Sequence, residues 1–222
     1  NYSTAVGYQA LQDQNENDSN HNTAFGYQAG LNLTTGEKNV AIGSYAIGSG
    51  VTTGDKNTAV GQDAGVAVDT GARNIFIGAN AGDGISDAND NIAIGSNALG
   101  DASADVDRAI AIGTNALAAA DHPYDDRSIA IGYGALEQYS STEDENATVA
   151  IGYRAGYTGT TGLRQSVIIG YQTGYTNDNV RNTFVGYKAG HLCTGDSNVM
   201  IGHGAGVGAL ALDNSVLIGR GA

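Results

Sequence analysis

A short unit with a glycine at its centre recurs thirteen times in this chain of 222 residues and constrains its fold more than any other feature. The copy at Ser128–Leu136 reads SIAIGYGAL, and successive central glycines lie 16 to 20 residues apart. A period of this length is typical of solenoids, in which each unit packs mainly on its neighbours. The central glycines are Gly7, Gly26, Gly43, Gly61, Gly78, Gly95, Gly113, Gly132, Gly152, Gly170, Gly186, Gly202 and Gly219.

The repeat predicts one elongated domain over residues 1–222 instead of the one or two globular domains that this length would otherwise suggest. Helix is not expected, because no window sustains a 3.6-residue apolar period and glycine interrupts the chain at short intervals. Both ends fall inside a repeat, so we expect the chain to be a segment of a longer fibrous protein.

Charge and cysteine content exclude several classes of protein. The net charge of −13 argues against a nucleic-acid partner and against adsorption to anionic membranes, which both require basic surfaces. No stretch approaches the 18 apolar residues of a membrane-spanning helix. Cys193 is the single cysteine, so stability must come from stacking or assembly and not from an intrachain disulfide; we expect an inert, packed thiol.

Positions are numbered here from the central glycine of each copy. Positions −3 and −1 carry β-branched residues in every copy except for Phe25, which predicts a short strand with both positions on one face. Position −2, on the opposite face, is alanine in eight copies and a larger apolar residue in five. Because neither face is polar, we expect the strand to be buried on both sides, against the coil interior and against a neighbouring chain.

The second half of each copy predicts a turn, a close packing position and a variable connection. Position +3 holds twelve alanines and Thr173, which indicates a second strand packed closely over the first. Length varies only in the connection that follows, which we expect along one outer edge. Four connections share a Thr-Gly-x-x-Asn turn whose glycine is expected to supply a positive φ, at Thr35–Asn39, Thr53–Asn57, Thr70–Asn74 and Thr194–Asn198.

The sequences of the repeats resemble those of two families of surface proteins. The copies NVAIG at 39–43, IAIG at 92–95 and 110–113, and VAIG at 149–152 resemble the heads of trimeric autotransporter adhesins. The copies NTAFGYQAG at 22–30 and NTFVGYKAG at 182–190 resemble repeats of bacteriophage tail fibres. The resemblance spans the whole chain and implies a left-handed parallel β-roll of about 13 coils, assembled as a homotrimer. It also implies a place on a virion tail fibre or a bacterial cell surface.

Sequence motifs for catalysis are absent, so we predict a non-enzymatic protein without a cofactor. The four histidines fall in different repeats without metal-ligand spacing, and GHGAGVG at 202–208 lacks the Lys-Ser/Thr ending of a phosphate-binding loop. Acidic segments such as 13–18 and 143–145 read as solvated loops. Calcium bound through carboxylates is the alternative, with Asp83, Asp87 and Asp90 as the metal candidates.

Position −4 is asparagine in seven copies, which predicts a hydrogen-bonded ladder of side chains along the solenoid. The residues are Asn22, Asn39, Asn57, Asn74, Asn91, Asn182 and Asn198.

Tyrosines form the best candidate for a binding site. They occupy position +1 in four consecutive copies, and rungs about 4.8 Å apart would stack them into a ladder that could pack against sugar rings. The alternative is that the rings only stack on one another and stiffen the roll. The receptor-binding candidates are Tyr133, Tyr153, Tyr171 and Tyr187 at position +1, and Tyr157 and Tyr175 at position +5.

The sequence therefore predicts a trimeric fibre module that attaches to a cell-surface receptor. Many identical weak binding sites on one trimer would act together, so that avidity raises the overall affinity. A glycan is the expected ligand and a phage tail fibre the leading setting. The alternatives are a bacterial adhesin head and a purely structural spacer. Ice binding is disfavoured, because the threonines at position −3 are interrupted by isoleucine and valine.

Overall fold

The computed structural model describes residues 2–15, 20–48, 50–100, 106–119, 127–139, 147–158, 163–176, 180–208 and 211–222. Within these residues the secondary structure is entirely β, with one three-residue strand in each copy of the repeat. The strands are β1 (Thr4–Val6), β2 (Thr23–Phe25), β3 (Val40–Ile42), β4 (Thr58–Val60), β5 (Ile75–Ile77), β6 (Ile92–Ile94), β7 (Ile110–Ile112), β8 (Ile129–Ile131), β9 (Val149–Ile151), β10 (Val167–Ile169), β11 (Thr183–Val185), β12 (Val199–Ile201) and β13 (Val216–Ile218).

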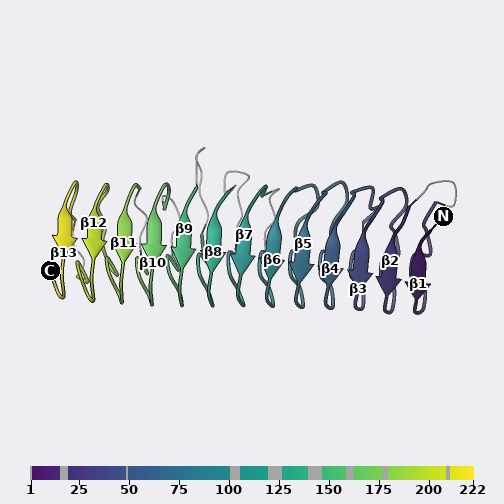
Figure 1. Cartoon of the computed structure of the whole chain (residues 1–222), viewed down its shortest axis with the longest axis horizontal. Coiled ribbons are helices and arrows are strands. Elements are labelled where there is room, and N and C mark those ends of the chain that lie inside the picture. The colour runs from purple at the N-terminus through teal and green to yellow at the C-terminus, as the bar shows by residue number, and fades with distance from the viewer. Residues whose placement is uncertain are drawn as a thin grey trace.

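The strands form one parallel sheet in chain order, so the predicted parallel β-solenoid is confirmed. Equivalent positions of neighbouring copies pair with each other, as Ile110 pairs with Ile129 and Ala111 with Ala130. Figure 1 shows the strands side by side along the long axis, with the two termini at opposite ends. The glycine turns follow one edge of the molecule, and the described connections between copies follow the other edge, as predicted.

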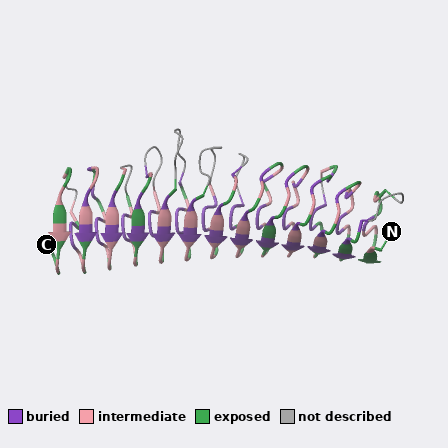
Figure 2. Cartoon of the chain, turned by 45° about the horizontal axis from the view of Figure 1, so that its top comes forward, coloured by how far each residue is buried: buried purple, intermediate pink, exposed green. Residues whose placement is uncertain are grey.

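Each strand from β2 to β12 buries its middle residue and turns its two outer residues away from the coil. The burial patterns in Figure 2 reflect this alternation, since the position −2 residues of β2 to β12 are buried and their neighbours are partly or fully exposed. Position −2 faces the coil interior, as expected for one face of the strand, whereas positions −3 and −1 stay partly or fully exposed in the described part of the chain. Burial of this outer face against a neighbouring chain stays a prediction.

The predicted second strand at position +3 is wrong. Position +3 is buried, as at Ala98 and Ala116, but it lies in a turn. The residues on either side of it have positive φ in the left-handed region, for example 55° at Asn115 and 51° at Leu117. Left-handed residues reverse the local direction of the backbone, so an extended strand cannot continue through this position. Alanine fits here because the side chain points into a narrow interior.

The central glycines allow the coils to stack. A Cβ on Gly113 would lie 2.6 Å from the carbonyl oxygen of Gly132, and a Cβ on Gly132 would lie 2.5 Å from that of Gly152. Both glycines also have φ of 131°, a conformation that other residues rarely adopt. Each turn therefore needs glycine for its own backbone and for contact with the next coil.

The glycines of the Thr-Gly-x-x-Asn turns are required for a different reason from the predicted one. Their glycines do not have positive φ; that conformation falls two residues later, as at Lys38 with φ of 60°. Gly36 is required instead by close stacking, because a Cβ there would lie 2.5 Å from the carbonyl oxygen of Gly54. The expectation of a positive φ at these glycines is thus wrong, and the actual constraint comes from the adjacent coil.

The predicted asparagine ladder is confirmed. The backbone N–H of Asn39 donates to Oδ1 of Asn22 at 2.8 Å, and Nδ2 of Asn39 donates to the carbonyl oxygen of Gly54 at 2.9 Å. The same pair of bonds recurs from Asn39 to Asn57, with Nδ2 of Asn57 donating to Gly71. These side chains are buried, so the ladder satisfies backbone groups that water does not reach.

No helix in the part of the chain described above is both long and apolar enough to cross a membrane.

Candidate functional site

The four tyrosines at position +1 form the predicted ladder. The ring centroids of Tyr133 and Tyr153 are 5.4 Å apart, those of Tyr153 and Tyr171 are 5.1 Å apart, and Tyr187 follows at 5.3 Å. Neighbouring ring planes differ by 6° to 12°. His203 is exposed and extends the stack beyond Tyr187, with a centroid distance of 4.7 Å.

Stacking changes what this ladder can bind. Each inner ring has another ring over both faces, so its faces are not free for a sugar. The tyrosines nevertheless remain 39% to 44% exposed, with Tyr153 at 39% and Tyr133 at 44%. What they present to a ligand is therefore a row of ring edges. A phenolic hydroxyl at each rung would add hydrogen-bonding groups to such a row.

A second, shorter ladder lies at position +5. Tyr157 stacks on Tyr175 at 5.0 Å, and His191 continues the stack at 5.1 Å. Burial raises the pKa of the Tyr157 hydroxyl, and the carboxylate of Glu137 raises it further. The pKa of His191 is lowered by burial and by the positive charge of Lys188.

Arg154 joins the two ladders. Its guanidinium carbon lies 4.8 Å from the ring centroid of Tyr157 and 5.5 Å from that of Tyr153. Lys188 has a similar place, with Nζ 5.6 Å from the centre of the Tyr187 ring. Both cations occupy position +2, which the sequence reasoning did not consider. An alignment of position +2 would have shown that Arg154 and Lys188 directly follow tyrosines of position +1.

A second aromatic group lies near the start of the chain. Tyr8 and Tyr27 stack at 5.4 Å, and Tyr45 meets Tyr27 edge-on with an interplanar angle of 74°. Tyr45 was not predicted here, because it stands at position +2 and not at position +1.

The calcium candidates do not converge. Asp90 accepts two hydrogen bonds from Arg73, at 2.5 and 2.9 Å, and Asp87 accepts one from the hydroxyl of Thr70 at 2.8 Å. Asp83 stands at position +5, in the half of its copy that follows the glycine turn. The described residues contain no group of three or more metal-ligating side chains. Residues 16–18 and 143–145 of the acidic segments lie outside the described part.

Cys193 is buried, as predicted, and burial raises the pKa of its thiol. Its sulfur accepts a hydrogen bond from Nδ2 of Asn198 at 3.8 Å. A buried, protonated thiol is a poor nucleophile, so this residue has the properties of a packing side chain.

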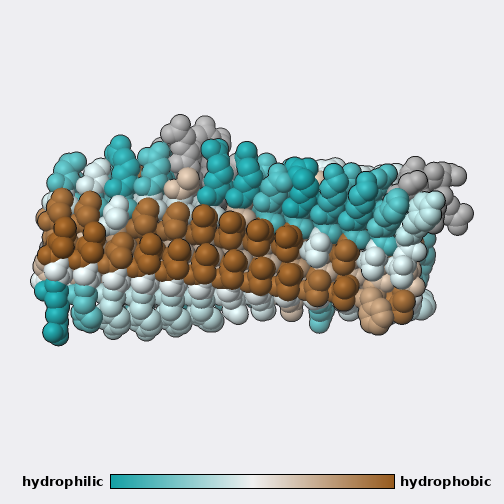
Figure 3. Space-filling view, viewed as in Figure 1, coloured by the Kyte–Doolittle hydropathy of each residue, from teal (hydrophilic) through white to brown (hydrophobic). Residues whose placement is uncertain are grey.

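The outer face of the sheet carries an extended apolar surface. Figure 3 shows two adjacent apolar rows running along the molecule over the strands, bordered by hydrophilic residues. These rows are positions −3 and −1, and Ile77 and Val167 within them are each 38% exposed. Neither position carries a charged residue in any of the thirteen copies. We call these two rows the apolar face.

No protein family model matches the chain, and comparison with curated proteins and with solved structures also found no match.

Proposed function

We propose that this chain is a non-enzymatic fibre module that assembles with two further copies of itself and contributes to attachment at a cell surface. The three rolls, each wound in a left-handed sense, would lie side by side along a common axis, as the resemblance in the sequence implies. The setting would be a phage tail fibre or, as the alternative, a bacterial adhesin head.

The apolar face carries this proposal. Soluble monomers rarely expose a contiguous apolar patch larger than a few hundred Å². Here the patch runs along the sheet, with threonine at position −3 in four copies, and even at the middle of the molecule Ile94 and Ile112 are only partly covered. Burying such a face stabilises an assembly by roughly 25 cal/mol for each Å² removed from water.

Further copies of this chain are the partner that fits the face best. Its side chains repeat at the strand spacing of about 4.8 Å, and a partner must match that spacing over the whole length. A second copy running in the same direction provides an identical side chain at every rung. A globular partner of different structure would match only a few rungs. Rotation about an axis parallel to the roll keeps the copies in register and closes the assembly.

The mass of the folded protein tests the assembly. Light scattering is expected to give three times the 22.5 kDa of one chain. Replacing Ile94→Glu together with Ile131→Glu places charges on the apolar face and should shift the mass towards that of a single chain. Ser96→Glu together with Thr114→Glu adds the same charges at position +1 and should leave the mass unchanged. A single-chain mass for the folded parent protein would contradict the proposal.

The tyrosine ladder supports the attachment role. Ring edges and phenolic hydroxyls in a straight row suit hydrogen bonding to the hydroxyls of a glycan, and avidity multiplies weak contacts in a trimer. Replacing Tyr133, Tyr153, Tyr171 and Tyr187 by phenylalanine removes the hydroxyls but keeps the stacked rings. We expect this variant to retain its thermal stability and to lose binding to host cells or glycans.

The competing function is a structural spacer with no binding site of its own. It predicts that the phenylalanine variant and a variant with alanine at the same four positions bind as well as the parent protein, provided that both remain folded. Equal binding by both would therefore exclude the tyrosine ladder as the attachment site.

A further inference from the structure

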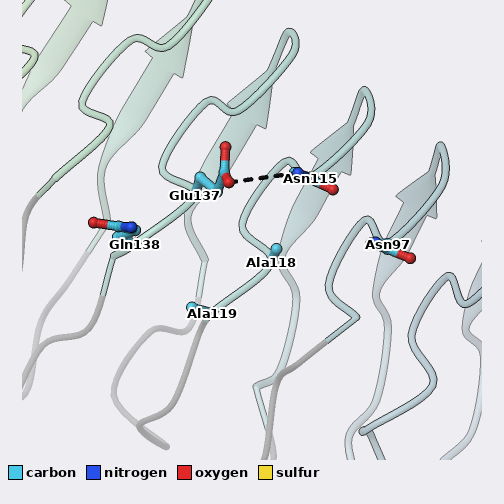
Figure 4. A pocket seen from close by; sticks show the side chains of 6 residues that line it. All are labelled: Asn97, Asn115, Ala118, Ala119, Glu137 and Gln138. Atoms are coloured by element: carbon cyan, nitrogen blue, oxygen red, sulfur yellow. Dashed lines mark hydrogen bonds between the residues drawn. The ribbon is translucent and has the colours of Figure 1, made fainter.

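A hollow of about 220 Å³ opens on the surface formed by the residues that follow the glycine turns. Figure 4 shows its lining, which comes from three consecutive copies of the repeat. The lining residues are Asn97, Asn115, Ala118, Ala119, Glu137 and Gln138.

The hollow exists because the size of the side chain at position +5 differs between consecutive copies. This position is small in two consecutive copies, Gly100 and Ala118, and then becomes Glu137 and Tyr157. The short side chains leave space beside the asparagines of position +2, and the Glu137 side chain closes one end. Because the residue at position +5 differs widely between copies, the hollow is a local feature of this part of the chain.

Polar groups surround this space. Asn97, Asn115 and Gln138 bring three side-chain amides, each of which can donate and accept hydrogen bonds. Glu137 adds a carboxylate, and its Oε1 accepts a hydrogen bond from Nδ2 of Asn115 at 3.4 Å. Figure 4 shows this contact across the hollow's edge. A length of 3.4 Å is beyond the usual range for such a bond, so the contact holds the carboxylate only weakly.

The Glu137 carboxylate can also accept further hydrogen bonds. Among the described residues, its buried Oε2 has no hydrogen-bond partner. A Cβ on Gly134 would lie 2.5 Å from Oε2 of Glu137 and 3.3 Å from Cγ of Arg154, so these two side chains meet at this glycine. No ion pair between them is recorded among the described residues, and the buried Nε of Arg154 likewise has no hydrogen-bond partner there. The Arg154 guanidinium lies instead against the rings of Tyr153 and Tyr157.

Rotation of the Glu137 carboxylate would cost little. The terminal torsion of a glutamate side chain is broad, so the carboxylate can turn an oxygen towards a donor in the hollow. A buried acceptor without a partner is unfavourable, and a ligand that supplies a donor removes that cost.

Size and charge select the ligand class. A volume of about 220 Å³ is below the 300–1,000 Å³ of sites for drug-sized ligands, so the hollow suits a single ring. Hydroxyl groups both donate and accept, which matches three amides and one carboxylate. The net charge of −13 and the carboxylate at the rim disfavour an anion.

We propose that this hollow is a binding subsite for one neutral sugar unit of a glycan, with Glu137, Asn97, Asn115 and Gln138 as its hydrogen-bonding groups. The proposal rests on the attachment role proposed above and gives that role a defined pocket. It lies within one chain and does not require assembly.

A glycan array probed with the whole chain tests the subsite. Neutral hexose and N-acetylhexosamine glycans form one arm, and sialylated or sulfated glycans form the other. We expect neutral glycans to bind and Glu137→Gln to weaken binding about tenfold or more, since a hydrogen bond to a charged group is lost. Glu37→Gln removes a carboxylate at the other edge of the roll and serves as the control.

A second variant blocks the space without removing a polar group. Ala118→Leu fills the hollow, and Leu31 already occupies position +5 in another copy, so the fold accepts this side chain. We expect its binding to fall as in Glu137→Gln while its thermal stability stays that of the parent.

Three outcomes would overturn the subsite: no neutral glycan binds, only anionic glycans bind, or both variants bind like the parent. Light scattering on the same samples separates these outcomes from a failure of assembly. The tyrosine-to-phenylalanine variant separates them from failure of the ladder.

Discussion

The ring of Phe76 occupies the core space beside Gly82, so that a Cβ on Gly82 would overlap the ring atoms. In the following copy the sizes are reversed, with Ala93 at position −2 and Leu99 at position +4, both fully buried. The two positions therefore share one volume inside each of these coils. The same pairing of a large residue with glycine is seen at Phe184, where a Cβ on Gly190 would lie 2.6 Å from the ring.

This exchange of volume predicts a compensating pair of substitutions. Phe76→Ala alone should lower the free energy of unfolding by about 3–5 kcal/mol through the cavity it leaves. Gly82→Leu alone should lower it by about 1–3 kcal/mol through overpacking. The double variant copies the Ala93 and Leu99 arrangement and should be clearly more stable than the sum of the single effects. Thermal and urea unfolding of all four proteins measures the coupling. Simple additivity would contradict the shared volume.

Stacking of the central glycines predicts that their substitution depends on the neighbouring coil. Gly113→Ala would bring a Cβ to 2.6 Å from the carbonyl oxygen of Gly132 and should disrupt the solenoid locally. Gly204→Ala is the control, because Gly204 also has positive φ but has no atom within 4 Å of the added Cβ. We expect a cost of about 1 kcal/mol for the control and a much larger loss for Gly113→Ala, measured by thermal unfolding. Similar losses for the two would show that φ alone dictates glycine.

The asparagine ladder predicts a graded response at Asn57. Its Oδ1 accepts from the backbone N–H of Asn74 at 2.9 Å, and its Nδ2 donates to Gly71. Asn57→Ala leaves the backbone N–H of Asn74 and the carbonyl oxygen of Gly71 without these partners in the interior. The free energy of unfolding should fall by about 1–3 kcal/mol for each unpaired group. Asn57→Ser should cost less, since Ser166 at the same position accepts from the backbone N–H of Asn182 at 3.0 Å. A serine variant as unstable as the alanine variant, by urea unfolding, would argue against the ladder.

The lowered pKa of His191 predicts that acid destabilises the second aromatic ladder. The unfolded chain binds a proton near pH 6.5, whereas the folded chain binds it only at lower pH because of burial and Lys188. Stability should therefore fall as the pH drops below about 6.5 and should show no contribution from His191 well above that value. His191→Gln removes this contribution. Melting temperatures compared between about pH 8 and about pH 5 should fall less for the variant than for the parent. An equal fall in both would contradict the prediction.

Much of the fold was predictable because the repeat places equivalent residues on neighbouring rungs. Once Asn39 and Asn57 occupy the same position, parallel pairing brings them about 4.8 Å apart, and their ladder follows. The same reasoning gave the stacking of Tyr153 on Tyr171. These predictions required only the period of the sequence and the spacing of strands. They did not require knowledge of how the backbone closes each coil.

The candidate hollow was not predictable in this way. It depends on Glu137 at position +5 lying beside Asn115 at position +2 of the preceding copy, which sequence separation does not reveal. The free acceptor on Glu137 depends likewise on the Arg154 guanidinium packing against aromatic rings, since no ion pair between it and the carboxylate is recorded among the described residues.

The strands, their order and register, and the ladders along the roll follow from the repeat alone, because a repeated position needs only one spacing to meet its copies. Which face of the strand points inward follows instead from the path of the folded coil. Left-handed residues such as Asn115 and Leu117 turn the chain back over position −2, so that position becomes the core and positions −3 and −1 become the apolar face. The stacking of coils also decided why Gly36 must be glycine, since its constraint is the carbonyl of Gly54 and not its own φ.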